Sequence, residues 1–160
     1  MQDFFKRYIP EFVYGAVDGT VTTFAVVAAS AGAGISSSVI LILGIANLIA
    51  DGFSMGSSAY LAASAEHEES VRDSQKRSSP KIIGAVTFLA FVVVGSVPVL
   101  PYLIDVIANL KAPNAVLFYV SSALTAATFL AIGFIKGKVS KQSPWQSAGI
   151  TLLLGAIAAG

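Results

Sequence analysis

The sequence predicts an all-α integral membrane protein, with residues 1–160 forming a single transmembrane domain of five helices. Hydrophobic residues make up 55% of the chain, charged residues 12%, and the mean hydropathy is +0.77. A soluble domain has roughly 45–50% apolar and about 25% charged residues. A bilayer core about 30 Å thick takes roughly 20 apolar residues as a helix, and five stretches approach or exceed that length.

These five stretches lie at about residues 12–33, 37–62, 81–104, 113–135 and 144–160. Pro80, Pro113 and Pro144 stand where a helix begins, the position at which a missing N–H costs least. Pro98 and Pro101 are expected to kink or end the third helix, because each removes a backbone donor. The fifth stretch is the shortest: about 17 residues span roughly 25 Å at 1.5 Å per residue.

The positions of Lys and Arg predict the orientation. Nine of the ten basic residues lie before the first helix, between the second and third, or between the fourth and fifth; Lys111 is the exception. Because cytosolic loops carry the excess of Lys and Arg, we predict a cytosolic N-terminus and a C-terminus outside. The basic start also resembles a cleaved signal peptide, but the apolar run is longer than that template and contains Asp18.

The remaining composition argues against other protein classes. The net charge of +1 gives no reason to expect a nucleic-acid partner, and the absence of cysteine excludes disulfides and thiolate metal sites. His67 is the single histidine and lies in a predicted loop, and no convincing nucleophile–base pair accompanies it. We therefore expect neither an enzyme nor a permanently bound cofactor.

Two acidic residues lie within predicted membrane spans. Asp18 lies about 9 Å and Asp51 about 15 Å from the cytosolic surface, counted at 1.5 Å per residue along their antiparallel helices. A carboxylate at bilayer depth costs about 2.5–3.5 kcal/mol on insertion scales, so it tends to face a partner or a water-filled path. Both are expected to line one ion path in the cytoplasmic half. Glu11 lies seven residues before Asp18 and shares its face.

Asn47, Asp51 and Met55 form a stripe on the second helix, with a spacing of four residues. The stripe combines amide oxygen, carboxylate oxygen and thioether sulfur. Mg²⁺ and Ca²⁺ prefer oxygen alone, whereas a thioether favours softer metals, which points to Fe²⁺ or Mn²⁺. The alternative is that Met55 fills a gap in the core, as methionine often does.

Each membrane aspartate is followed by a glycine of a G-x-x-x-G segment: Asp18 precedes Gly19 of the segment Gly15–Gly19, and Asp51 precedes Gly52 of the segment Gly52–Gly56. Inside a bilayer such glycines let helices approach closely. The Asp-Gly pairs are therefore interpreted as packing positions that bring an acid next to a neighbouring helix. The alternative is that both acids serve only as interhelical hydrogen-bonding groups.

The segments "VYGAVDGTVTTFAVVAASAGAG" and "ILILGIANLIADGFSMGSSAYLAAS" resemble the first two helices of the vacuolar iron transporter family, which includes nodulin-21-like and bacterial members. "SPWQSAGITLLLGAIAAG" resembles the fifth helix more weakly. The resemblance implies a homodimer of five-helix subunits with the ion path at the dimer interface, exporting Fe²⁺ or Mn²⁺ from the cytosol against protons. By position, Asp18 and Met55 match the family's pathway acid and thioether, and Asp51 matches the acid of its ADG-x-SM motif.

The chain departs from the family pattern in two places. Plant vacuolar members carry a long, glutamate-rich cytoplasmic insert after the second helix, whereas only a short linker, 66–80, stands here. Glu66, His67 and Glu69 are candidates for cytoplasmic metal capture, although an ordinary solvated helix end is the favoured interpretation. Ala59 occupies the position at which many relatives have an acid, which leaves the metal preference open.

A simple chemistry connects these residues to transport. A carboxylate that loses water is costly in its charged form, so Asp18 and Asp51 should hold either a proton or a cation, and metal binding needs the deprotonated form. The sequence therefore predicts a Fe²⁺ or Mn²⁺ transporter that exchanges metal for protons in a bacterial inner or vacuole-type membrane. A non-transporting membrane scaffold or subunit, or a proton-coupled carrier of another small solute, remains the alternative.

Overall fold

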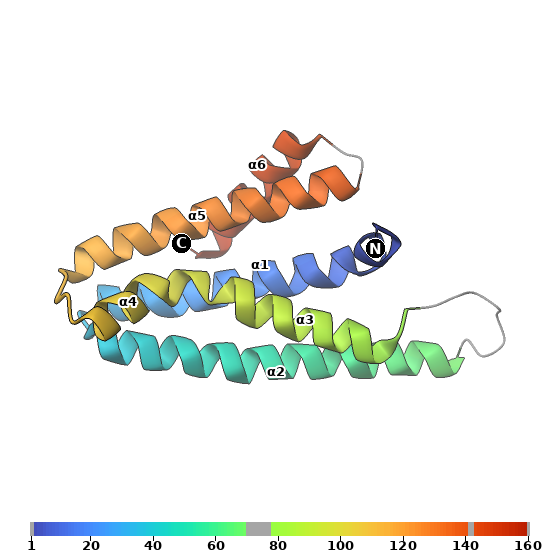
Figure 1. Cartoon of the computed structure of the whole chain (residues 1–160), viewed down its shortest axis with the longest axis horizontal. Helices are drawn as coiled ribbons and strands as arrows, with labels where there is room; N and C mark the ends of the chain where they lie inside the picture. Colours follow the sequence, from blue (N-terminus) through green and yellow to red (C-terminus); the bar gives the residue numbers. More distant parts are fainter. Residues whose placement is uncertain (1, 70–77, 141–142, 160) are drawn as a thin grey trace.

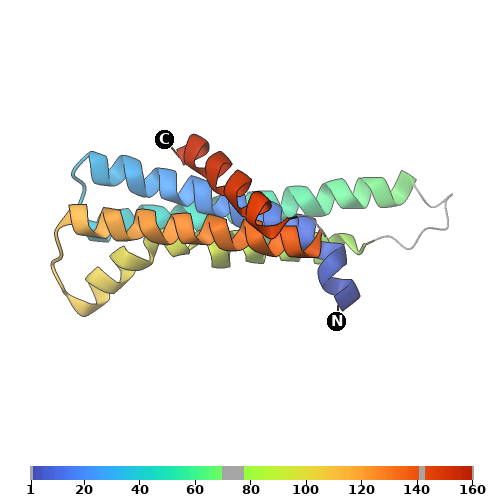
Figure 2. The ribbon, with the colours of Figure 1, turned by 90° about the horizontal axis from the view of Figure 1, so that it is seen from above.

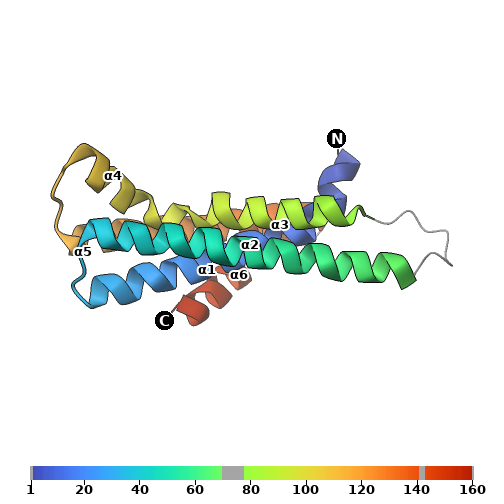
Figure 3. The same cartoon turned by 90° about the horizontal axis from the view of Figure 1, so that it is seen from below.

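The computed structural model describes the backbone of residues 2–69, 78–140 and 143–159, and the side chains of 7–66, 78–140 and 143–157. Long helices lie side by side and run alternately up and down one axis (Figures 1 and 3). In chain order the elements are α1 (Gln2–Gly32), α2 (Ser37–Glu69), α3 (Pro80–Gly95), η2 (Val97–Val99), α4 (Leu100–Ala108), α5 (Asn114–Val139) and α6 (Pro144–Ala159).

Four helical segments among the described residues are long and apolar enough to cross a membrane, as expected of an integral membrane protein: residues 7–32, 37–66, 80–108 and 114–139. They correspond to the first four predicted spans. The predicted fifth span, 144–160, forms α6, which has 16 residues and is not among them. A helix of 16 residues rises about 24 Å, less than the thickness of a bilayer core.

Two predicted helix boundaries need correction. The first helix begins near Gln2 instead of residue 12 and contains Pro10. Its first turns are angled away from the rest (Figure 2), as expected where a proline ring removes a helical hydrogen bond. The second helix continues past residue 62 to Glu69, so it takes in the start of the predicted linker. No glycine or proline interrupts 62–69, and polar residues alone do not end a helix.

The predicted third span, 81–104, is broken. α3 ends at Gly95, the 3-10 turn η2 follows, and α4 continues in a new direction (Figure 3). Pro98 and Pro101 remove two backbone donors in this region, which physically accounts for the break. The hydroxyl of Ser121 on α5 donates to the carbonyl oxygen of Pro98 at 2.7 Å, so the broken helix is held to its neighbour.

The helix ends gather at the two ends of the bundle. Residues 33–36 and 109–113 lie at one end, while the first turns of α1, the end of α2, the start of α3, the end of α5 and the start of α6 lie towards the other (Figure 1). Lys81, Lys136 and Lys138 therefore lie towards one end, and Lys111 at the opposite end. This is the separation of charge on which the orientation prediction depends.

Helix α3 is the packing centre of the first half of the chain. A Cβ added to Gly19 would lie 2.5 Å from the carbonyl oxygen of Phe91, and one added to Gly56 would lie 2.8 Å from the Cβ of Phe88. Gly15 and Gly52 face the same helix. Consequently α1 and α2 pack more closely against α3 than against each other. The core beside these contacts joins all these helices through Val27, Ile40, Leu48, Phe91, Val99, Tyr102 and Leu117.

Candidate functional site

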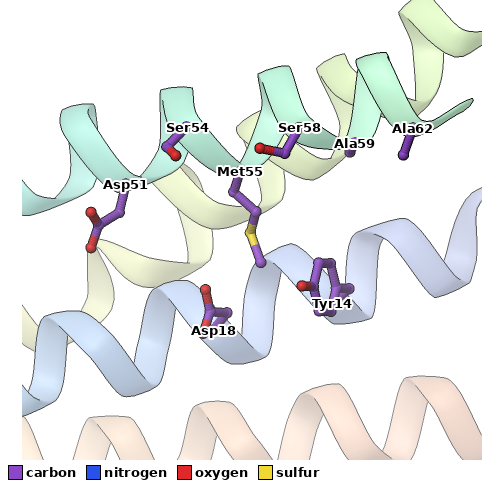
Figure 4. A pocket seen from close by; sticks show the side chains of 8 residues that line it. All are labelled: Tyr14, Asp18, Asp51, Ser54, Met55, Ser58, Ala59 and Ala62. Carbon is purple, nitrogen blue, oxygen red and sulfur yellow. The ribbon is translucent and has the colours of Figure 1, made fainter. Parts of the chain in front are cut away.

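A pocket of about 470 Å³ opens between α1 and α2 (Figure 4). It contains Asp18 and Asp51, the two acids predicted to lie at membrane depth, together with Met55. Its full lining is Tyr14, Asp18, Asp51, Ser54, Met55, Ser58, Ala59 and Ala62. Two residues from α1 and six from α2 thus surround a space within two membrane-spanning segments.

The glycine contacts explain why the acids face this space. Asp18 immediately precedes Gly19, and Asp51 immediately precedes Gly52. Adjacent residues on an α-helix point about 100° apart, because one turn contains 3.6 residues. Since both glycines face α3, each aspartate is turned away from α3 and into the gap between α1 and α2.

The side chains approach the pocket from both helices. Figure 4 shows Met55 extending from α2 toward α1, with Asp18 and Tyr14 on the facing helix. Asp18 is half-buried and Asp51 is exposed, and their negative charges repel each other. Neither carboxylate forms a hydrogen bond or ion pair with the described residues. The oxygens are therefore available to an ion or to protons.

Asn47 lies outside the pocket and joins the two helices. Its side-chain amide donates to the hydroxyl oxygens of Thr22 and Thr23, at 3.4 and 3.3 Å. Thr22 in turn donates to the backbone carbonyl of Asp18 at 2.9 Å. Because Asn47 lies one turn beyond Asp51, these bonds close the space between α1 and α2 where the pocket ends.

Glu11 also lies outside the pocket. It is half-buried, and its Oε2 atom is buried without a hydrogen-bond partner among the described residues. Glu66 is exposed near the end of α2 and does not line the pocket either. The side chains of the other two capture candidates, His67 and Glu69, lie outside the described residues.

The pocket offers few side chains that could bind a metal ion. Within the described residues, no group of three or more His, Cys, Asp or Glu side chains could hold a metal ion. The pocket instead offers two carboxylates, one thioether and the hydroxyls of Tyr14, Ser54 and Ser58.

The sequence reasoning did not identify Ser54, Ser58 and Ala62 as lining residues. Their signal was present, since positions three, seven and eleven after Asp51 follow one face of a helix. Ala59 lines the pocket as well. An acid at that position, where the family resemblance would place one, would enter the pocket directly.

Comparison with known proteins gives the family. The family model described as "VIT family" matches residues 9–79 and 67–160. "Vacuolar iron transporter" of Toxoplasma gondii is 46% identical over 61 residues, covering 38% of this chain and 20% of that protein. "Vacuolar iron transporter 1" of Eucalyptus grandis is 28% identical over 210 positions, covering 94% of this chain and 82% of that protein.

The matches differ in extent. The chain spans about a fifth of the Toxoplasma relative but most of the Eucalyptus one. The latter alignment has 210 positions against 160 residues here, so the plant protein carries residues that this chain lacks. The family model matches in two segments that overlap at residues 67–79, from the last residues of α2 to the start of α3. Together these segments cover residues 9–160, and the chain belongs to the VIT family.

Proposed function

We propose that this protein is a membrane transporter that moves Fe²⁺ or Mn²⁺ out of the cytosol in exchange for protons. The observation that carries the proposal is the meeting of Asp18, Asp51 and Met55 in one pocket between two membrane-spanning segments. Membership of the VIT family, whose relatives are named vacuolar iron transporters, supports transport over catalysis. The membrane would be a bacterial inner membrane or a vacuole-type membrane.

The ligand chemistry favours a transition metal. Two carboxylates supply charge, and the thioether of Met55 favours an ion softer than Mg²⁺ or Ca²⁺. The pocket volume of about 470 Å³ leaves room for water beside the ion. A partly hydrated metal bound by few protein ligands can leave again, as conduction requires.

Proton exchange follows from the charge balance of the two acids. With Asp18 and Asp51 both ionised and unpaired, the pocket carries two repelling negative charges. One divalent cation or two protons would neutralise them equally. Since metal binding requires deprotonated carboxylates, metal and protons compete for the same oxygens, and each metal ion released can be replaced by two protons.

The shape of the pocket matches a state open toward the basic end of the bundle. Its lining runs along α2 from Ala62 to Asp51, and the Asn47 hydrogen bonds close the helices beyond. With the predicted orientation, metal would enter from the cytosol. Release on the other side would require the Asn47 bonds to Thr22 and Thr23 to break.

We further propose that the protein acts as a homodimer with this pocket at the interface. Asp51, Ser54 and Ser58 are exposed on the side of α2 where the pocket opens, although they lie within a membrane-spanning segment. A carboxylate facing hydrocarbon is costly. A second copy that covers this side of α2 would remove the acid from lipid and enclose the path.

Flux into proteoliposomes tests the proposal. Uptake of Fe²⁺, Mn²⁺ and Zn²⁺ would be compared with and without a pH gradient, for the natural protein and for Asp18→Asn. We expect uptake of Fe²⁺ or Mn²⁺ that the gradient accelerates and that the substitution abolishes. Uptake indifferent to both would refute the exchange. Absence of metal uptake would refute metal transport and favour the two alternatives, a scaffold or a carrier of another solute.

A further inference from the structure

The start of α6 forms a second polar pocket, separate from the one between α1 and α2. It has a volume of about 420 Å³ and is lined by Lys136, Ser143, Gln146, Ser147 and Ile150. None of these residues lines the pocket that holds Asp18 and Asp51. Its polar side chains are two hydroxyls, one amide and one ammonium group, all of which can donate hydrogen bonds, and no carboxylate is among them. This chemistry is that of an anion site.

Ser147 supplies a buried donor with no partner. The side chain is 6% exposed, and its Oγ atom makes no hydrogen bond in the described part of the chain. Thr151, one turn later, donates to the carbonyl oxygen of Ser147 at 2.9 Å. The Ser147 hydroxyl makes no corresponding bond to the carbonyl oxygen of Ser143, which accepts the backbone N–H of Ser147 at 3.0 Å. A buried hydroxyl normally has a partner, and one without it needs an explanation.

Close packing of α5 against α6 fixes the pocket. A Cβ added to Gly137 would lie 2.7 Å from the Cα of Pro144 and 3.0 Å from the Cβ of Ser147. The glycine therefore allows the first turn of α6 to rest on the last turn of α5, which carries Lys136. The Lys136 ammonium group makes no hydrogen bond or ion pair with the described residues.

The first turn of α6 adds further donors. The backbone N–H groups at the start of a helix have no partner within the helix, and the helix dipole places partial positive charge there. Pro144 has no N–H, so those of Trp145 and Gln146 are the first available. Backbone donors at a helix start together with a nearby lysine are the usual elements of a phosphate site.

Trp145 places this pocket near the membrane surface. Its side chain is 78% exposed and meets Phe134 edge to face, with ring centroids 5.6 Å apart. Exposed tryptophan is enriched at the headgroup level of membranes. The exposed tryptophan thus favours a position of the pocket at the depth where the phosphate groups of lipids are found.

From these observations we propose that the pocket at the start of α6 binds a phosphate group through Lys136, the Ser147 hydroxyl and the first backbone N–H groups of α6. The phosphate belongs either to a phospholipid headgroup or to soluble phosphate. Occupancy would hold the α5–α6 contact at the membrane surface. The inference does not depend on metal transport, since it uses none of the residues assigned to that path.

Trp145 is the single tryptophan of the chain and borders the pocket in sequence, so its fluorescence is a direct reporter. The full-length protein in detergent would be titrated with inorganic phosphate in one arm and phosphatidylglycerol in the other, at constant ionic strength. We expect a saturable change in at least one arm. A response to phosphatidylglycerol alone assigns the ligand to lipid, whereas a response to inorganic phosphate assigns it to a soluble source.

Three variants decide whether the pocket is responsible. Lys136→Ala should weaken binding about tenfold and Ser147→Ala about threefold, because charge-assisted hydrogen bonds are the stronger ones. Lys138→Ala is the matched control: this exposed lysine lies in the same last turn of α5 but does not line the pocket. Its affinity should be unchanged. Ser147→Ala keeps the helix and the close packing, so it remains informative if the lysine variant unfolds.

The proposal is overturned if neither arm shows a saturable response. It is equally overturned if Lys138→Ala weakens binding as much as Lys136→Ala does, because the effect would then be general surface charge. Unchanged affinity in Ser147→Ala would also contradict it, since the hydroxyl would then have no role in binding.

Discussion

The side-chain amide of Asn47 on α2 lies 3.3 Å from the hydroxyl oxygen of Thr23 on α1. This bond crosses between the two helices that form the acidic pocket, one helical turn beyond Asp51. From Asp51 towards Ala62, on the opposite side of this bond, the same two helices enclose the pocket. Together with the bond to Thr22, this contact therefore marks the boundary between the open and the closed part of the proposed path.

Breaking this contact should loosen the closed side. Asn47→Ala is expected to lower the free energy of unfolding by about 0.5–1.5 kcal/mol, the net worth of a typical hydrogen bond. In liposomes it should also increase proton leakage in the absence of metal, measured with a pH-sensitive dye. Thr23→Val removes one of the two hydroxyl partners and should produce both effects to a smaller extent. If neither variant leaks more protons than the natural protein, Asn47 does not close the path.

Neutralising one acid should separate transport from stability. Asp18→Asn is expected to reduce metal flux at least tenfold, since the pocket loses a charged ligand. It should also raise the free energy of unfolding slightly, by up to about 1 kcal/mol, because the repulsion from Asp51 is removed. Flux assays and thermal unfolding in detergent measure the two effects. Loss of both flux and stability would instead indicate a structural role for the carboxylate.

The contribution of the Met55 sulfur to transport can be tested separately from the contribution of the side chain's volume. Met55→Leu keeps the size and apolar character of the side chain but removes the thioether, and such exchanges usually cost less than about 1.5 kcal/mol in stability. We expect Fe²⁺ and Mn²⁺ flux to fall several-fold. Leu89→Ala, at an exposed position outside the pocket, serves as the control. Full activity of Met55→Leu would show that the methionine only fills space.

An added acid should strengthen metal binding. Ala59 lines the pocket, so Ala59→Glu would introduce a third carboxylate beside Asp18 and Asp51. Because carboxylates are the ligands that hard cations prefer, we expect tighter Mn²⁺ binding, by about tenfold, and less discrimination against Mg²⁺. Binding titrations in detergent provide the measurement. Ala59→Gln has a similar size without the charge and should leave affinity nearly unchanged.

The glycine contacts predict opposite effects at two positions. A Cβ at Gly19 would lie 2.5 Å from the backbone oxygen of Phe91, so Gly19→Ala should destabilise the protein by about 1–3 kcal/mol, as overpacking does. Gly149 on α6 has nothing within 4 Å. Gly149→Ala should therefore stabilise the helix, by up to about 1 kcal/mol. Thermal unfolding compares the two, and equal effects would contradict the packing described.

The sequence by itself determined the class of protein and most of its helical segments. Three features can be seen in the order of the residues without knowledge of the fold: apolar runs of membrane length, prolines at helix starts and the separation of basic residues. They follow from the cost of placing polar groups in hydrocarbon. The same argument identified Asp18 and Asp51, because a carboxylate in an apolar run is exceptional wherever the helix packs.

Only the tertiary structure decided which side of each helix meets which neighbour. Spacing placed Asn47 in a stripe with Asp51 and Met55, yet Asn47 bonds to α1 while the other two line the pocket. Glu11 shares a helical face with Asp18 but lies outside the pocket. Residues that share a helical face point in the same direction, but their spacing does not tell which of them meets another helix. Whether another helix lies within reach at that height depends on contacts between distant segments, here the close approach of α1 and α2 to α3.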